Sequence, residues 1–346
     1  FYYGDLAKLK IKQKKAYPLC GRQDTAFDKI EIFKRNKKII SNKIVSINKI
    51  EKLNKNERFA IKKNLKKIVS RRKNFIKNIN FSKPTIMGIL NLTPDSFSDG
   101  GKFNNKNKSF NHIKNMVDSG AKIIDVGGES TRPGSKTINQ RNEWQRIEYV
   151  IKNFKKKYKN ICLSIDTRKS EVMINSLCYG ANLINDVSGF NYDKKSLINL
   201  NKYKVSKVLH HMQGTPSTMQ IKPKYENVLL DIYDFFKDKI KFLKKNGINQ
   251  DKIILDPGIG FGKNLKHNLK ILRNISIYHS LGSPILLGVS RKRFIGDLSN
   301  NNDSFERIGG TIGSCIFLMM QGVQILRVHD INEIQQSIKV FKELIK

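Results

Sequence analysis

The stretch KIIDVGGESTRPG, residues 122–134, shows in one place the pattern that decides the fold. A short apolar run rich in β-branched residues ends in glycines and then in polar residues, among them Thr131 and Arg132. The pattern occurs eight times after residue 84, with helical periodicity between the runs. Alternating strands and helices require a parallel sheet, and eight units are enough to close a (β/α)8 TIM barrel. The runs are TIMGILN (85–91), KIIDVG (122–127), ICLSIDT (161–167), ANLINDVSG (181–189), KVLHHMQG (207–214), KIILDPGIGFGK (252–263), ILLGVSRK (285–292) and QILRVHD (324–330).

The periodicity also places each element of this α/β fold. We expect strands at 85–91, 122–126, 161–165, 182–186, 205–210, 252–255, 284–289 and 323–328. We expect helices near 109–119, 140–157, 169–179, 193–202, 225–246, 264–275, 303–321 and 330–345. In this fold the chemistry occurs at the carboxyl ends of the strands. The polar residues that end the eight runs should therefore form one active site.

Residues 1–83 differ from the rest of the chain. The protein has 346 residues and a net charge of +37, and about half of that excess lies in this first quarter. We therefore predict two units, a basic N-terminal extension at 1–83 and a barrel at 84–346. On the barrel, abundant Lys, Asn and Ile, which share AT-rich codons, account for the basic surface, although positive charge also attracts anionic substrates.

The extension carries a hairpin pattern and a helical pattern. Residues 29–47 alternate as a β-hairpin does. A basic amphipathic helix can bind a membrane or RNA, but more often it rests on a neighbouring domain. Aromatic residues are few among the basic ones, so we expect neither a nucleic-acid nor a membrane partner. The apolar residues at helical spacing across 57–79 are Ile61, Leu65, Ile68, Ile76 and Ile79.

The four cysteines show neither metal-ligand nor disulfide spacing. Cys162 falls in an apolar strand run, and Cys178 and Cys315 fall in helical runs. We therefore expect buried free thiols in a reducing compartment. Because no segment approaches 18 uninterrupted apolar residues, the cytoplasm is the expected location.

The first two strand tips carry candidates for metal and phosphate binding. Asn91 offers a carboxamide oxygen that can hold Mg²⁺, an ion that usually keeps water and substrate phosphates as its other ligands. The glycine-rich loop 92–101 behind it is long enough to close over a substrate. Thr131 and Arg132 supply a hydroxyl and a guanidinium, which suit phosphate oxygens. The alternative for this second loop is an ordinary helix start.

Three further tips carry groups that can read a flat heterocycle. Asp166 and Asn185 end adjacent strands and combine acceptors with an amide donor, although either residue could instead cap the next helix. Asp256 can accept two hydrogen bonds from a guanidine-like edge, and the neighbouring glycines let Phe261 approach a flat ligand. The DPGIGFGK string lacks the glycine and hydroxyl positions of a phosphate-binding P-loop.

The last two tips add cations. The run SRK supplies the hydroxyl of Ser290 and the two cations Arg291 and Lys292, and RVHD supplies Arg327 and His329. Together with Arg132, these residues predict an anion site of two or three positive charges. No nucleophile with a neighbouring base is legible, which argues against a hydrolase.

These residues lie in strings that resemble the dihydropteroate synthase family, which sulfonamides target. The resemblance covers residues 84–346, and the strings follow the family's order. The strings are GILNLTPDSFSDGG, IIDVGGESTRPG, SIDT, INDVSG, HMQGTPSTMQ, LDPGIGFGKN, GVSRKRFIG and RVHD.

The resemblance implies an enzyme, a transferase of folate biosynthesis. Such an enzyme condenses 6-hydroxymethyl-7,8-dihydropterin diphosphate with 4-aminobenzoate to give 7,8-dihydropteroate and pyrophosphate. The resemblance also implies that Mg²⁺ is the cofactor and that the protein is a homodimer. Fusion to upstream folate enzymes occurs in this family, so residues 1–83 are interpreted as the tail of such a partner. The resemblance implies these roles: Asn91 for Mg²⁺; Thr131, Arg132, Arg327 and His329 for the diphosphate; Asp166, Asn185, Asp256 and Lys292 for the pterin; Met212 and Phe261 for packing; Ser290 and Pro133 beside the aminobenzoate; and Lys292, Arg327 and His329 for catalysis.

The chain departs from the family's wording at Ile259, where Phe is expected, and after Thr167, where Arg-Lys-Ser replaces Ser-Lys-Pro. Neither change falls on a residue with an implied role. Another pterin-binding barrel, such as a methyltransferase, would share the acid and the amide but would not need the cations at 132, 292 and 327. A catalytically silent homologue would carry a broken site residue, and none is found.

Overall fold

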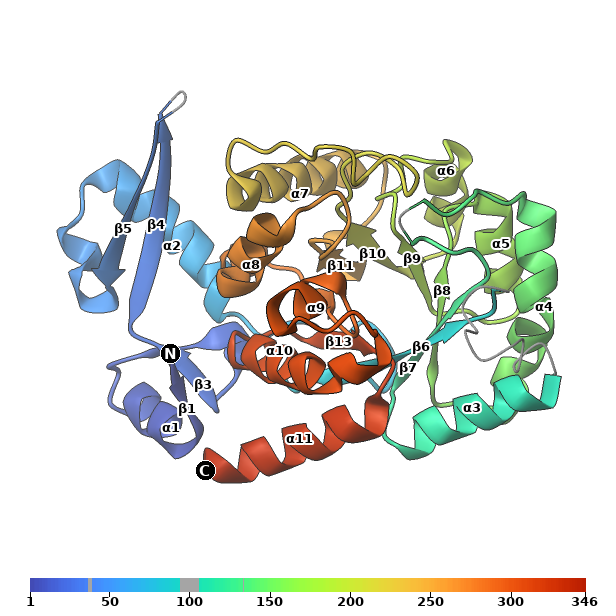
Figure 1. Ribbon diagram of the computed structural model, residues 1–346. Helices are drawn as coiled ribbons and strands as arrows, with labels where there is room; N and C mark the ends of the chain where they lie inside the picture. Colours follow the sequence, from blue (N-terminus) through green and yellow to red (C-terminus); the bar gives the residue numbers. More distant parts are fainter. Residues whose placement is uncertain (37–38, 94–105, 133) are drawn as a thin grey trace.

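The computed structural model describes residues 1–36, 39–93, 106–132 and 134–346. Eight parallel strands follow one another around a barrel in chain order. Figure 1 shows helices surrounding these strands. A bridge between Leu255 and Ile285 joins the remaining edge, so the predicted (β/α)8 fold is confirmed. The strands are β6 (Thr85–Asn91), β7 (Ile123–Gly127), β8 (Cys162–Asp166), β9 (Leu183–Asp186), β10 (Ser206–His210), β11 (Ile253–Asp256), β12 (Leu286–Gly288) and β13 (Ile325–Val328).

Nine helices are described around this barrel, and several begin at an asparagine that caps the first turn. The Asn139 and Asn227 side chains accept backbone N–H groups at the starts of α4 and α7, and Asn264 forms a capping box on α8. The helices are α3 (Lys106–Asp118), α4 (Gln140–Lys157), α5 (Ser170–Cys178), α6 (Lys195–Lys202), α7 (Val228–Lys245), α8 (Leu265–Arg273), α9 (Arg293–Ser299), α10 (Ile308–Met320) and α11 (Ile331–Leu344).

One predicted barrel helix is wrong in extent. The helix predicted near 303–321 is a 3₁₀ turn at Phe305–Arg307 followed by α10, which begins only at Ile308, and α9 before them was not predicted. The Asn300 backbone is left-handed (φ 55°) and ends α9, and the Arg307 guanidinium donates to the carbonyl oxygens of residues 291, 301 and 302. These side-chain contacts hold the connection in a compact turn.

Residues 1–36 and 39–69 lie beside the barrel, at the left of Figure 1. A three-stranded sheet has the order β1-β3-β2, and β4 and β5 form the predicted hairpin. Among the 3₁₀ turns are η1 (Leu19–Gly21) in the extension, and η4 (Gln250–Lys252) and η5 (Ile275–Leu281) in the barrel. The elements are β1 (Tyr2–Tyr3), α1 (Gly4–Lys12), β2 (Tyr17–Pro18), β3 (Thr25–Phe27), β4 (Lys29–Asn36), β5 (Ile39–Ser46) and α2 (Lys55–Val69).

The predicted helix across 57–79 is also wrong at its C-terminal end, because α2 stops at Val69. Ile76 and Ile79 belong to the irregular segment that follows, where Asn78 is left-handed (φ 64°). They are buried with Phe81 at the amino-terminal end of the barrel. Burial inside the barrel outweighs the local helical spacing.

This end of the barrel is filled in a regular way. Each of the eight strands contributes one buried side chain to the cluster that contains Ile76, Ile79 and Phe81. Segment 76–81 therefore closes the bottom of the barrel, opposite the strand tips. The strand residues are Met87, Ile123, Cys162, Leu183, Val208, Ile254, Leu286 and Ile325.

The extension also docks on the barrel through polar contacts centred on His279. Cys20 Sγ lies 3.3 Å from His279 Nδ1, and Arg72 donates to the His279 carbonyl oxygen at 2.9 Å. Cys162 and Cys315 are buried as expected, and Cys20 is buried too, whereas Cys178, which was expected to be buried, is exposed at the end of α5. Within the described residues, no helix is long and apolar enough to cross a membrane.

Candidate active site

The carboxyl ends of four adjacent strands lie in register. Asn91 pairs with Gly127, Gly127 with Asp166, and Asp166 with Asn185. A Cβ added at Gly127 would lie 3.4 Å from the Asp166 Cβ and 3.6 Å from Asn91 Oδ1. The missing side chain therefore leaves a small space between a carboxamide oxygen and a carboxylate.

Arg327 joins two acids below this row. Its Nε donates to Asp125 Oδ2 at 2.7 Å, and its Nη2 donates to Asp166 Oδ2 at 2.9 Å. Asp125 also accepts from Ser164 Oγ at 2.6 Å and from Asn185 Nδ2 at 3.0 Å. Burial raises the pKa of Asp166 to about 7, against the opposing effect of Arg327, and the nearby Asp125 raises it further.

Asn185 carries the clearest sign of a missing partner. Its Nδ2 is fixed by Asp125, and its Oδ1 is buried without a hydrogen-bond partner among the described residues. A buried carbonyl oxygen that lacks a donor is costly. A ligand with an N–H or NH₂ group would satisfy it.

Asp256 offers a second acceptor at the tip of β11. Its Oδ1 accepts the Gly258 N–H at 2.8 Å, and its Oδ2 lies 4.0 Å from His210 Nε2. His210 Nδ1 lies 3.0 Å from the Val187 carbonyl oxygen, which can only accept, so the ring proton is on Nδ1 and Nε2 does not donate to Asp256. Burial raises the pKa of Asp256 to about 6, while the Gly258 N–H and Lys292 oppose the rise.

Phe261 and Lys292 face each other beside Asp256. The Lys292 ammonium lies 4.4 Å from the centroid of the Phe261 ring, and the His210 ring packs edge-on against Phe261 at 4.6 Å. Burial lowers the pKa of Lys292 to about 8, and Arg327 lowers it further. The predicted packing surface and the predicted cation therefore lie together.

His329 and Ser290 are also brought together. Ser290 Oγ accepts the His329 amide N–H at 3.2 Å and lies 3.1 Å from the ring Nδ1. Because burial and then the cations Arg291 and Arg327 lower the pKa of His329 to about 3, the ring is neutral. We infer that the Ser290 hydroxyl donates a hydrogen bond to Nδ1. The proton of the neutral ring is then on Nε2, which can donate to an anion.

The loop that carries Thr131 and Arg132 is held from behind by buried charges. Arg168 donates to Glu129 Oε2 at 3.0 Å, and Lys169 Nζ lies 3.0 Å from Glu129 Oε1 and 2.5 Å from Glu143 Oε2. All four of these side chains are buried. Glu129 also accepts the Ile138 N–H, so one carboxylate fastens the far end of the loop to the start of α5.

Several predicted residues have less defined positions. Thr131 is partly buried and Arg132 is exposed, although Arg132 lies close enough to contribute to the lowered pKa of His329. Met212 is partly buried just beyond β10. Pro133 and most of the 92–101 loop lie outside the described residues.

The interpretation of both cations of the SRK run as an anion site needs correction. Arg291 pairs with Asp330 and packs its guanidinium 4.5 Å from the Phe305 ring centroid, so its charge is already compensated, although it lies near enough to His329 to lower the pKa of that ring. Its backbone is left-handed (φ 59°). Arg327 faces the site, but two acids already compensate its charge.

Sequence reasoning missed two residues at the centre of this arrangement. Asp125 was hidden in the middle of an apolar strand run, and an acid in such a position was the available signal. Lys263 is buried, its Nζ lies 3.0 Å from His211 Nδ1, and burial lowers its pKa to about 7. Within the described residues, no group of three His, Cys, Asp or Glu side chains is placed to hold a metal.

Several known proteins are similar to this chain in sequence and in fold. The model of the pterin binding enzyme family matches residues 87–329. The dihydropteroate synthase of Escherichia coli strain K12 is 40% identical over 263 residues, which cover 76% of this chain and 92% of that protein. The chain belongs to the dihydropteroate synthase family. It is therefore a transferase that makes 7,8-dihydropteroate in folate biosynthesis.

Solved structures agree. The Yersinia pestis dihydropteroate synthase, crystallised as a sulfonamide drug complex, has a TM-score of 0.74 and 39% identity, and the match covers 77% of this chain and 96% of that one. The Xanthomonas albilineans synthase with 4-aminobenzoic acid has a TM-score of 0.72 and 33% identity, and the match covers 77% and 94%.

Proposed function

We propose that the pterin ring lies between Phe261 and the strand tips of β8, β9 and β11. The unsatisfied Oδ1 of Asn185 carries this proposal, because a pterin offers N–H groups that would complete it. Asp256 would accept two hydrogen bonds from the guanidine-like edge of the ring. Asp166 and Lys292 would bond the remaining polar edge. Met212 would add apolar contact.

The diphosphate would bind where the cationic groups converge. Thr131 and Arg132 approach from the loop, and His329 Nε2–H approaches from β13. Arg327 would act at shorter range on the reacting end of the substrate, since it is anchored on Asp125 and Asp166. This arrangement places positive potential at the leaving group, where charge develops during the reaction.

The residues beside Gly127 also fit Mg²⁺. Asn91 Oδ1 is a hard oxygen ligand next to the space that Gly127 leaves, and substrate phosphates with water would supply the other ligands. When bound, Mg²⁺ would neutralise the diphosphate and stabilise the departing pyrophosphate.

The chain's own residues need no covalent step for this reaction. The aromatic amine of 4-aminobenzoate is neutral and nucleophilic at pH 7. Its nitrogen forms a bond to the pterin methylene as the carbon–oxygen bond to pyrophosphate breaks, and the amine then loses a proton to water. Positioning and electrostatic stabilisation account for the catalysis. Ser290 and the loop beyond Arg132 would border the aminobenzoate.

The decisive experiment measures pyrophosphate release with Mg²⁺, pterin diphosphate and 4-aminobenzoate, omitting each in turn. We expect release to require all three and to equal dihydropteroate formation. Asp256→Asn should weaken pterin binding about 100-fold, because two charge-assisted hydrogen bonds are lost. Asp186→Asn is the matched control, since Asp186 is a similarly buried acid whose hydrogen bonds, among the described residues, go to Ser188 and Phe190. Equal pterin affinity in the two variants would refute the assignment of Asp256.

We also propose that the protein is a homodimer that pairs through α10. Gly309, Gly313 and Phe317 recur every four residues on its exposed side, and a Cβ added at either glycine would meet nothing within 4 Å. The Phe317 side chain is 45% exposed. Such a smooth apolar stripe suits a second helix. Light scattering of the wild type against Gly313→Glu tests the pairing.

We place the protein in the cytoplasm and propose that residues 1–83 form an extension of the barrel at 84–346, with segment 76–81 packed into the bottom of the barrel. The four free thiols support a reducing compartment. The interpretation of the extension as the tail of an upstream folate enzyme rests on the family resemblance alone. Cell fractionation tests the first proposal.

A further inference from the structure

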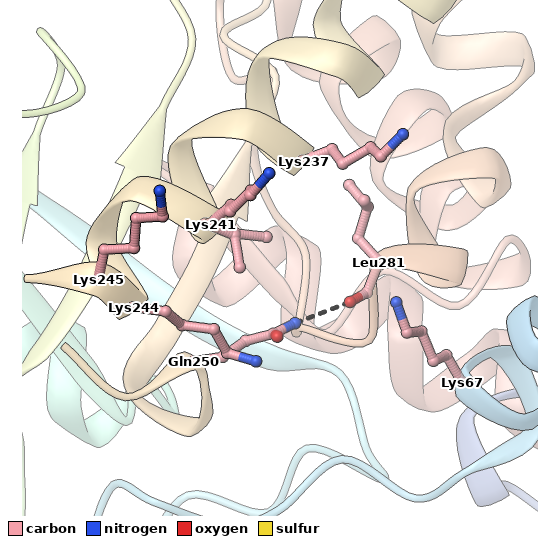
Figure 2. Close-up of a pocket in the computed structure, with 8 residues that line it drawn as sticks. Lys67, Lys237, Lys241, Lys244, Lys245, Gln250 and Leu281 are labelled. Atoms are coloured by element: carbon pink, nitrogen blue, oxygen red, sulfur yellow. Dashed lines mark hydrogen bonds between the residues drawn. The ribbon is translucent and has the colours of Figure 1, made fainter. Parts of the chain in front are cut away.

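A second concave site lies on the seam between the extension and the barrel. It is a cavity of about 350 Å³. Figure 2 shows the lysines around it. α7 contributes four of them and α2 contributes Lys67, and Gln250 and Leu281 complete the rim. Gln250 is fixed by a 2.8 Å hydrogen bond to the Leu281 carbonyl oxygen. The α7 lysines are Lys237, Lys241, Lys244 and Lys245.

The spacing on α7 makes these lysines neighbours. Counted from Lys237, the other three lysines lie four, seven and eight positions further along the helix, so all four share one face. Ile240 lines the cavity beside them. Like charges at this spacing repel each other. Lys67 faces this row from the other wall, with its side chain 3.6 Å from the position of a Cβ at Gly282.

None of the five lysines forms an ion pair with a described residue, although nearby cations do. In the same region, Lys43 pairs with Glu57, Lys73 with Asp251, and Arg35 with Asp231 and Asp234. Partial burial, followed by the cations Lys63 and Lys244, lowers the pKa of Lys67, so its ammonium lies in a positive field.

The cleft is separate from the active site. α7 leads through η4 into the amino-terminal end of β11, so its last turns lie at the end of the barrel opposite the strand tips. Lysines 241, 244 and 245 belong to those turns. Neither the pterin nor the diphosphate proposed above comes near them.

We propose that this cleft binds a small polyphosphate anion, either inorganic or the phosphate chain of a nucleotide. Ammonium groups from two walls would contact separate phosphate groups, and the Gln250 amide would add a polar contact. The cavity has the size of a small-ligand pocket. Because one wall belongs to the extension and the other to the barrel, the bound anion would also clamp the two units together.

The test is calorimetric titration of the full chain with inorganic tripolyphosphate at fixed ionic strength. The cleft variant is Lys67→Glu with Lys241→Glu, and Lys67→Gln with Lys241→Gln is a milder form. The control is Lys159→Glu with Lys339→Glu, which changes the net charge equally at two exposed lysines outside the cleft. We expect the cleft variant to bind at least roughly tenfold more weakly, because charge-assisted contacts are lost. The control should bind like the wild type, and all variants should keep normal pyrophosphate release.

Each other outcome has a defined meaning. Equal weakening in the control would show nonspecific attraction to a basic protein and overturn the proposal. Unchanged binding in the cleft variant, with loss in Arg132→Ala, would place the anion at the strand tips alone and also overturn it. Competition by ATP would support recognition of the phosphate chain. Tighter binding of single-stranded RNA through the same lysines would replace the small ligand with nucleic acid.

Discussion

Burial moves the titration of two charged groups at the strand tips toward neutrality. The pKa of Asp256 rises to about 6 and that of Lys292 falls to about 8. Asp256 must be ionised to accept two N–H groups, so pterin binding weakens as pH falls through 6. Lys292 must be protonated to act as a cation, so activity weakens as pH rises through 8.

We therefore predict a bell-shaped pH profile of kcat/KM for the pterin diphosphate, with limbs near pH 6 and pH 8. Steady-state rates between pH 5 and 9.5 measure it. In Lys292→Arg, any remaining activity should lose the upper limb, since a guanidinium stays charged. A profile that is flat across this range would rule out both assignments.

Glu129 makes a second prediction at the scale of single residues. Glu129→Gln removes a charge that compensates Arg168 and Lys169, all of them buried, and breaking such a network costs about 3–5 kcal/mol. The loop carrying Thr131 and Arg132 should lose its anchor. We expect kcat/KM for the pterin diphosphate to fall roughly tenfold or more, a change of about 1.4 kcal/mol or more in the transition-state free energy.

The control for this variant is Glu148→Gln, which breaks the exposed pair with Lys152 on α4. Its kinetics and melting temperature should match the wild type. If Glu129→Gln loses stability but keeps wild-type kinetics, the network supports the fold and does not position the loop.

The success of sequence reasoning differs between elements. The strand at 85–91 and the helix at 140–157 were predicted with their observed bounds, because a β-branched run and a 3.6-residue stripe each record burial on a continuous face. The helix across 57–79 failed because Ile76 and Ile79 are buried by distant strands, which leave no local signal. The sequence did not predict α9, because the side chain that shapes its end, Arg307, lies outside the segment.

The site residues divide in the same way, into those with a local sequence signal and those whose partners are distant in the sequence. Tips such as Asp166, Asn185 and Asp256 were recognisable because each polar residue follows an apolar run at once. Their partners were not recognisable, because side-chain hydrogen bonds between strands that are far apart in the sequence depend on the closed barrel. Asp125 meets Arg327 across 202 positions of sequence. The pairing of Arg291 with Asp330 was not predicted either, because the left-handed backbone of Arg291 has no signature in the sequence.

At the scale of the whole molecule, we expect the free energy of unfolding to depend on segment 76–81, which closes the bottom of the barrel. Phe81 is 1% exposed, packs 5.0 Å from the Phe75 ring and belongs to the cluster to which every strand contributes one residue. Phe81→Ala should lower the free energy of unfolding by about 3–5 kcal/mol, through lost burial and the cavity left behind. Denaturant unfolding measures this change.

Function should respond differently from stability. The strand tips lie at the opposite end of the barrel, so turnover of Phe81→Ala at saturating substrate should stay normal well below its melting temperature. Phe59→Ala is the control, because Phe59 is 72% exposed on α2 and its loss should leave unfolding unchanged. If Phe81→Ala unfolds like that control, the segment is a covering rather than part of the core. If it stays folded but loses turnover, the two ends of the barrel are mechanically coupled, and residues before 84 contribute to catalysis.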